Sequence, residues 1–239
     1  MKLLLPKFSA VFIRLTDFLR WLPLRLLRLA RHLQYSFSNP SIQHPNTLRN
    51  LPLQWLIELF VLFLDCFGIT EIYETLSDFT KFNTRPLTNW EKQLAQQVFG
   101  NTINYERVRL DEYALAGPRQ YQFCYVSFFT VNSWGKMNNA LLLHELTHVW
   151  QYENLGATYI PRALRAQHSE MGYNYGGVEA LKEARSNQQT IYHFNLEQQA
   201  DIVMDYYHLR EGYCAQWDAT ASFQDLPVYE YFVDQLKAG

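Results

Sequence analysis

A five-residue string, His144-Glu145-Leu146-Thr147-His148, constrains this chain more than any other part of its sequence. Residues four apart lie one above the other on a helix, so the two imidazoles can share one metal ion. Glu145 lies about 100° around the helix from the first histidine, where its carboxylate can reach a metal-bound water without binding the metal. Asn138 or Asn139 can cap this helix, and Gly156 follows its end. The string therefore predicts a helix that carries two ligands of a zinc site.

A zinc site of this kind needs a third protein ligand and leaves its fourth position to water. In one subclass that ligand is a third histidine, which follows the second by six residues and is preceded by a glycine. Gln151 and Asn154 stand at those two positions here, so the three-histidine site is excluded. The remaining alternative is a carboxylate from a second helix further along the chain.

The segment that starts at Asn195 is the best source of that carboxylate. Asn195 can cap a helix with Gln198 as its capping-box partner, and Gly212 can end it. Glu197 and Asp201 are four residues apart and therefore share one face. We expect Glu197 to bind the metal and Asp201 to accept the free N–H of a ligating imidazole. An ordinary solvated acidic face is the alternative interpretation.

Other candidate ligands lie between the two helices, and these are Glu170, Glu179, Glu183, His168 and His193. Glu179 and Glu183 have helical spacing, but Lys182 and Arg185 beside them favour a solvated, ion-paired helix. We expect His168 and His193 to be hydrogen-bonded loop residues, although either could stabilise an oxyanion. Glu197 is therefore the preferred third ligand.

Four blocks of sequence carry a resemblance to known proteins, namely residues 85–92, 98–109, 144–151 and 194–201. The combination H-E-x-x-H followed by E-x-x-x-D resembles the gluzincin class of zinc metallopeptidases. Together the blocks are similar to the uncharacterised zincin-like proteins that accompany Vgr and Rhs components of bacterial type VI secretion. The likeness covers roughly residues 83–212. It implies Zn²⁺ as cofactor and a zincin-like α+β fold, mainly helical, with a small sheet ahead of the metal helix.

The amino-terminal part differs from the rest in charge, since residues 1–50 carry a formal charge of +7 and residues 51–239 carry −9. Basic and apolar residues alternate through residues 1–34, which predicts a basic amphipathic helical arm, limited or kinked at Pro6 and Pro23. Charges interrupt each apolar run before it reaches the length of a signal-peptide core or of a spanning helix. We expect this arm to bind either an anionic membrane surface or a groove on a partner protein, and the acidic remainder argues against nucleic acid.

A strongly apolar segment, Leu51 to Ile69, follows a predicted linker at residues 35–50. Glu58 and Asp65 interrupt it seven residues apart, on one face of a helix. Two carboxylates are costly in lipid, so we expect a helix packed on protein with that face outward. A membrane-inserting hairpin with residues 1–33 is the alternative.

The remainder of the chain has the pattern of a globular domain. Strands are predicted at 103–116 and 120–133, from their β-branched and aromatic residues. In zincins a strand just ahead of the metal helix holds extended substrate, and by resemblance residues 120–133 would do so here. Predicted helices start at Thr88 (capped with Glu91, ended by Gly100), at Pro161, at Val178 and at about residue 226.

These patterns predict three parts, which are the arm (1–34), the linker with its apolar helix (35–82) and a zincin-like metallopeptidase domain (83–239). The expected mechanism has zinc on His144, His148 and Glu197, with Glu145 as general base. An oxyanion donor is also needed, and Tyr175, with Tyr173 near it, is the candidate because glycines flank that segment. Three scattered cysteines predict packed thiols in a reducing compartment.

Three functional hypotheses follow. The first is a zinc-dependent peptidase that cleaves a protein or peptide and is linked to a secretion system as effector or accessory protein. The second is a zincin-fold adaptor without turnover that docks to a secretion spike or a membrane. The third is hydrolysis of another bond, such as an amide in a cell-wall peptide. Without a signal peptide, we expect the protein in the cytoplasm or peripherally on the membrane of the producing bacterium, and a contractile secretion system could export it.

Overall fold

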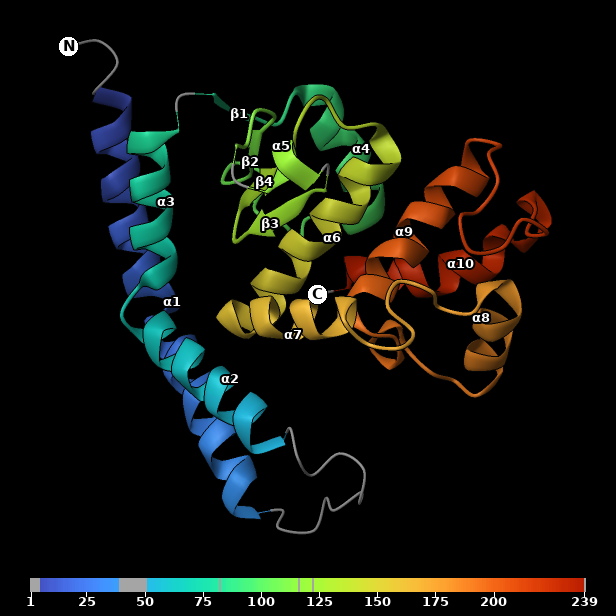
Figure 1. The fold of residues 1–239 in the computed structure, drawn as a ribbon, viewed down its shortest axis with the longest axis horizontal. Coiled ribbons are helices and arrows are strands. Elements are labelled where there is room, and N and C mark those ends of the chain that lie inside the picture. The colour runs from blue at the N-terminus through green and yellow to red at the C-terminus, as the bar shows by residue number, and fades with distance from the viewer. Residues whose placement is uncertain (1–4, 39–50, 82, 116, 122, 239) are drawn as a thin grey trace. The chain divides into compact units, whose positions relative to one another are not determined.

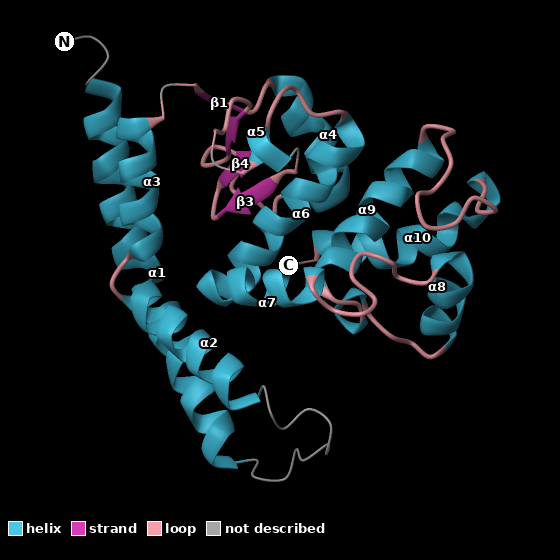
Figure 2. Cartoon of the chain, in the orientation of Figure 1, coloured by secondary structure: helices cyan, strands magenta, loops and turns pink. Residues whose placement is uncertain are grey.

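The computed structural model describes residues 5–38, 51–81, 83–115, 117–121 and 123–238 of the chain. Figure 1 shows the order of the elements along the chain, and Figure 2 shows that helices dominate. The chain separates into two compact units, the first formed by residues 1–82 with 155–161 and the second by residues 83–154 with 162–239. Among the described residues, no helix combines the length and the apolar character that crossing a membrane requires.

The first unit is built from α1 (Leu5–Ser38), α2 (Leu51–Cys66), α3 (Ile69–Thr80) and the short 3₁₀ helix η1 (Gly156–Thr158). Helix α1 packs against both α2 and α3, and η1 packs against α2. Pro23 is exposed and lies inside α1, which remains helical beyond it to Ser38. The predicted linker begins later than expected, because residues 35–38 are helical and residues 39–50 lie outside the described part of the chain.

One expectation for α2 is wrong, because its two carboxylates face inward. Glu58 and Asp65 are both buried, while Leu53 and Phe60 on the other side of the helix are exposed. The cause lies in α1, which places cationic side chains on its packing face, with Arg25 Nε 3.3 Å from Asp65 Oδ1. The pairing partner stabilises carboxylates that would otherwise be costly to bury.

A small four-stranded sheet belongs to the second unit and contains β1 (Thr84–Pro86), β2 (Arg109–Asp111), β3 (Tyr125–Ser127) and β4 (Thr130–Asn132). The strand order is β1-β2-β4-β3, with β2 and β4 parallel and the other two pairs antiparallel. The sheet precedes the helix that carries the histidine motif. The predicted α+β class, mainly helical with a small sheet ahead of that helix, is confirmed.

The two long strands predicted from sequence are wrong in extent. The segment 120–133 folds as a short helix, α5 (Pro118–Tyr121), followed by the β3–β4 hairpin. Its turn lies at Phe128, which has a φ of 58°, and both Phe128 and Phe129 pack 5.2 Å from the Tyr152 ring. The aromatic residues that suggested a continuous strand therefore anchor a turn, because tertiary packing outweighs their strand preference.

Six further α-helices complete the second unit, namely α4 (Asn89–Phe99), α6 (Asn139–Leu155), α7 (Tyr159–Gln167), α8 (Gly177–Ser186), α9 (Leu196–Arg210) and α10 (Leu226–Val233), of which α6 and α7 also contribute residues to the first unit. Short 3₁₀ helices η2 (Ile191–His193), η3 (Phe223–Asp225) and η4 (Asp234–Lys237) connect or extend them. The predicted capping boxes Thr88–Glu91 and Asn195–Gln198 are both present. Helices α6 and α9 are buried over most of their lengths, which makes them the centre of the core.

Candidate metal centre

Helix α6 presents the two histidines of the motif from inside the core. Asn138 caps its start, since Asn138 Oδ1 accepts a hydrogen bond from the Leu141 backbone N–H at 2.8 Å. The side chains of His144 and His148 are both buried, and their rings lie 5.0 Å apart, edge to face. Helix α6 has buried residues on every side, so its two imidazoles lie in the interior of the protein.

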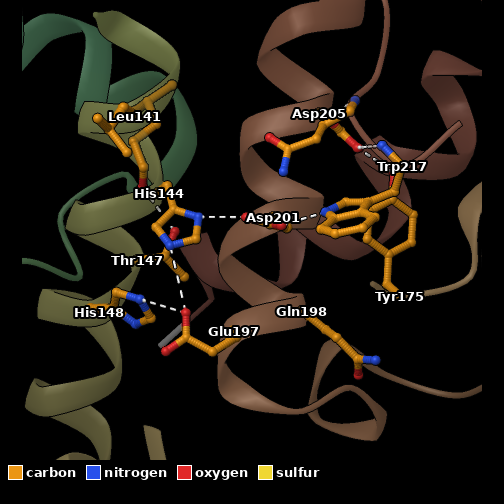
Figure 3. Close-up of polar contacts among 12 residues, drawn as sticks. Leu141, His144, Thr147, His148, Tyr175, Glu197, Gln198, Asp201, Asp205 and Trp217 are labelled. Carbon is orange, nitrogen blue, oxygen red and sulfur yellow. Dashed lines mark hydrogen bonds and ion pairs between the residues drawn. The ribbon is translucent and has the colours of Figure 1, made fainter. Parts of the chain in front are cut away.

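Helix α9 presents Glu197 to these rings from its first turn. The Asn195 side chain accepts hydrogen bonds from the backbone N–H groups of Glu197 and Gln198, both at 2.9 Å, and so fixes the start of the helix. Glu197 Oε2 lies 3.3 Å from His148 Nε2 and 3.7 Å from His144 Nε2 (Figure 3). The three candidate ligand atoms all lie within 4.8 Å of one another.

The Glu197 carboxylate provides the test of whether a cation fits here. Both of its oxygens are buried, and neither accepts a well-formed hydrogen bond from the described part of the chain. A buried carboxylate left in this state is costly, and a cation between the three side chains would satisfy it. The buried cluster of His144, His148 and Glu197 therefore fits a bound metal ion.

Each imidazole is oriented by a partner on its far nitrogen. His144 Nδ1 lies 2.7 Å from Asp201 Oδ1, and the Trp217 indole N–H donates to the same carboxylate. His148 Nδ1 lies 2.8 Å from Gln151 Oε1. Both Nε2 atoms are thereby left to face Glu197, the arrangement in which imidazoles bind metals.

Gln151 is itself held in place, because its amide nitrogen donates to the Leu196 carbonyl at 2.8 Å and to Gln199 Oε1 at 3.0 Å. Gln199 in turn donates to the Phe194 carbonyl at 2.9 Å. This network leaves the Gln151 oxygen as the acceptor for the His148 N–H.

The charges of the cluster are strongly coupled. Burial opposes protonation of His144, but the nearby carboxylates of Asp201 and Glu197 outweigh it and raise its pKa to about 10. Burial likewise works against ionisation of Glu197, yet the two histidines lower its pKa to about 2. The carboxylate is therefore the anionic centre of the site.

Glu145 lies beside the cluster, buried, with its Oε2 atom accepting no hydrogen bond from the described residues. Burial is the main reason that its pKa is raised, with further contributions from the Glu197 and Asp201 charges. Burial and the Glu145 charge together raise the pKa of the Cys124 thiol to about 12. Cys124 immediately precedes β3, so the start of this edge strand lies within electrostatic range of Glu145.

The two tyrosines considered as oxyanion donors occupy different places. The Tyr173 ring stacks on His144 with centroids 6.2 Å apart, and burial, followed by the cluster's carboxylates, raises its pKa. The buried Tyr175 hydroxyl instead donates to Asp205 Oδ2 at 2.7 Å and lies 2.8 Å from the Tyr229 hydroxyl. The structure thus places Tyr173, rather than Tyr175, against a candidate ligand.

The competing ligands lie apart from this cluster. Glu170, Glu179, Glu183, His168 and His193 are all exposed. Glu179 forms an ion pair with Lys182 at 2.8 Å, as the sequence predicts, and His168 Nδ1 lies 2.7 Å from the Leu164 carbonyl oxygen. Within the described ranges, His144, His148 and Glu197 form the one cluster with metal-binding geometry.

Three supporting residues were not anticipated from the sequence, and they are Gln151, Gln199 and Trp217. Gln151 follows His148 by three residues, so helical spacing alone could have identified it. Trp217 contacts Asp201 from a loop after α9, and no local sequence pattern predicts such a contact.

Comparison with known proteins gives one distant relationship. No known family profile matches the chain, and no solved structure matches it either. The type VI secretion system spike protein VgrG2b of Pseudomonas aeruginosa is 29% identical over 137 residues, which cover 52% of this chain and 13% of that protein. The chain therefore matches only a small part of its relative's length. It is similar, over about half of its own length, to a portion of a secretion spike protein.

Proposed function

We propose that this protein is a zinc-dependent peptidase that works with a type VI secretion apparatus. The observation that carries the proposal is the buried cluster of His144, His148 and Glu197, with the Glu145 carboxylate beside it. The partial similarity to VgrG2b supports the link to secretion. Two imidazoles and one carboxylate are the ligand set that catalytic zinc sites of this type use.

A bound zinc ion would act as a Lewis acid, lowering the pKa of a water molecule and polarising the scissile carbonyl. Glu145 accepts the proton of the attacking water and delivers it to the leaving amine. Its raised pKa suits this role, because a carboxylate with a pKa closer to neutral can both take and return a proton.

Two other groups have roles in this proposal. Tyr173, stacked on His144, replaces Tyr175 as the candidate donor to the tetrahedral oxyanion. Strand β3 is at the edge of the sheet, and its start lies within electrostatic range of Glu145. An extended peptide that adds to this edge would hold its scissile bond near the cluster.

The test compares the wild-type chain with Glu145→Gln. We expect elemental analysis to find one equivalent of zinc in both proteins, because Glu145 is not among the ligands. Cleavage of an unfolded protein or a peptide library should fall by about 10²–10⁴-fold in the variant, the usual contribution of a general base. Glu153→Gln, on the same helix but outside the cluster, is the matched control and should cleave normally.

Two results would contradict the proposal. If wild-type protein binds no zinc, the metal centre is wrong. If the wild type and Glu145→Gln bind zinc and behave identically in every cleavage and toxicity assay, the fold serves as an adaptor without turnover.

A further inference from the structure

Several charged side chains of the first unit lie in its interior. The Arg25 guanidinium is 4% exposed and donates to both Glu71 oxygens, at 3.0 and 2.7 Å. Its Nε atom also lies 3.3 Å from Asp65, which is 1% exposed. A cation between two carboxylates thus forms the centre of the contact between α1 and the α2–α3 pair.

Further ionic contacts continue along the same interface. Arg14 lies 3.4 Å from Glu74 and forms an ion pair with Asp78. At the other end, His32 Nδ1 lies 3.9 Å from Glu58 Oε2. The two sides run antiparallel along the interface, where α1 contributes two arginines and the imidazole of His32, and α2 and α3 contribute the carboxylates. We call this interface the ionic seam, defined by Arg14, Arg25 and His32 on α1 and by Glu58, Asp65, Glu71, Glu74 and Asp78 opposite.

The side of α1 away from the ionic seam is apolar. Phe12, Leu19, Leu26 and Leu33 recur every seven residues and are 68%, 61%, 51% and 37% exposed. A seven-residue repeat keeps these four side chains on one face of the helix. In a straight helix Phe12 lies about 160° around the axis from Arg14, and each later member of the repeat lies about 20° closer to it, so all four are at least about 100° away.

The α2–α3 pair repeats this distribution. Leu53, Phe60 and Phe67, also seven residues apart, are each more than half exposed, and Leu56 and Phe63 extend the same surface. On α3, the exposed Ile72 and Leu76 lie opposite the buried Glu74. The exposed apolar side chains of α1, α2 and α3 together form what we call the outer surface.

A hollow with a mainly apolar lining lies between α1 and α3, beside the turn that joins α2 to α3, and Arg14 and Glu71 of the ionic seam also line it. Its volume is about 390 Å³, and Leu15, Phe18, Phe67 and Ile72 are among the residues that line it. The hollow adds apolar lining to the outer surface, and part of an acyl chain would fit into it.

Water favours exposed charges and buried apolar side chains, whereas the first unit buries many of its charges and exposes apolar side chains. So many exposed large apolar side chains on one small unit are rare on soluble monomers, and they mark a contact with a partner or with lipid. In lipid, charged side chains face the interior of a helix bundle and pair with one another, as they do in the ionic seam. A groove on a partner protein covers one face of one helix. In the hairpin that α1 forms with α2 and α3, exposed apolar residues lie on all three helices.

We propose that the first unit embeds its outer surface in the acyl-chain region of a lipid bilayer. Each helix alone carries charges that would oppose this, but in the folded hairpin the ionic seam pairs them away from the lipid. Arg20 and Arg31 are exposed on α1, and their long stems let the guanidinium groups reach the headgroups. The proposal is independent of catalysis.

Flotation of the full chain with phospholipid vesicles tests the proposal. The vesicles would be zwitterionic in one series and would contain anionic lipid in another. We expect the protein to float with both and to stay bound at roughly 1 M salt, where charge attraction is screened. Flotation with anionic vesicles alone and release by salt would show surface attraction instead and overturn the proposal, as would no flotation.

A variant of the outer surface, Leu19→Ser, Leu26→Ser, Phe60→Ser and Phe63→Ser combined, should lower vesicle partitioning by at least about tenfold. The matched control replaces four exposed apolar residues of the second unit with serine, namely Leu115, Tyr121, Leu164 and Met171. It should partition like the wild type, with circular dichroism confirming that both variants are folded. Equal flotation of the two variants would overturn the proposal. So would a stable wild-type dimer in lipid-free buffer that the first variant abolishes, because a second copy would then cover the outer surface.

Discussion

At the scale of single residues, the candidate metal centre has a polar partner on the far side of each imidazole. Asp201 Oδ1 lies 2.7 Å from His144 Nδ1 and Gln151 Oε1 lies 2.8 Å from His148 Nδ1, so both Nε2 atoms are left to face Glu197. Groups in such positions determine metal affinity nearly as strongly as the ligands do.

We therefore expect Asp201→Asn to weaken zinc binding by about 10–100-fold, because the amide no longer offers a charged acceptor to His144. Competition with a chromophoric chelator measures the effect. Glu211→Gln, exposed at the end of the same helix, is the control and should bind zinc as the wild type does. Equal affinities of all three proteins would mean that Asp201 does not orient the ligand.

A second residue-scale effect concerns pH. Glu91 forms a bidentate pair with Arg85, at 2.9 Å for both contacts, and also accepts the Thr88 backbone N–H at 2.7 Å. Burial opposes its ionisation, but these partners lower its pKa from 4.5 to about 2. Because the folded pKa lies below the unfolded one, the charge stabilises the fold above about pH 4.5, and this stability is lost as the pH falls toward 2.

Urea denaturation of the wild type and Glu91→Gln at several pH values isolates this contribution. Arg85 is partly exposed, so we expect a difference of only about 1 kcal/mol at neutral pH. The difference should shrink as the solution is acidified below pH 4.5. A gap that stays constant down to the lowest pH would assign the effect to packing instead.

At the scale of elements, the caps of α4 and α9 are equivalent in chemistry but differ in what they support. Both helices begin with a capping box. The box of α9 holds the turn that carries Glu197, whereas the box of α4 holds a turn with no candidate ligand.

Asn195→Ala and Thr88→Ala should therefore cost similar stability, about 1 kcal/mol each. Only Asn195→Ala should also weaken zinc binding, because Glu197 loses its fixed backbone. Denaturant melts and chelator competition on both variants provide the comparison. A loss of zinc affinity in both, or in neither, would refute the link between the α9 cap and the site.

Local signals explain why the motif helices could be predicted. Asn138, Thr88 and Asn195 cap helices through contacts within a few residues, so the sequence around each position is sufficient. The burial of Glu58 and Asp65 was mispredicted because it depends on Arg25 and His32, which lie in a separate helix. Phe128 lies in a turn and not in the predicted strand because of its contact with Tyr152, which is distant in sequence and forms only in the folded chain.

At the scale of the whole molecule, the chain contains two compact units with different interiors. The second unit holds the candidate metal cluster within an apolar core, and the first is held together by the ionic seam. Metal binding should therefore stabilise one unit only.

Thermal melts with chelator and with excess zinc should show this difference. At a free zinc concentration about 1,000 times the Kd, binding stabilises the second unit by about 4 kcal/mol, while the transition of the first unit should not move. His144→Ala combined with His148→Ala is the control, and zinc should shift neither transition. Parallel shifts of both transitions in the wild type would show that the units unfold together.

The ionic seam makes the solubility of the amino-terminal helices a property of their conformation. When the hairpin is open, its arginines and carboxylates meet water, and the segment behaves as a charged chain. When it closes, the charges of the ionic seam pair with one another, and Leu, Ile and Phe side chains are exposed together with Arg20 and Arg31. Mean hydropathy, −0.25 for the chain, averages over both surfaces and describes neither. Under the proposal made above, these helices would therefore enter lipid only after the ionic seam has formed.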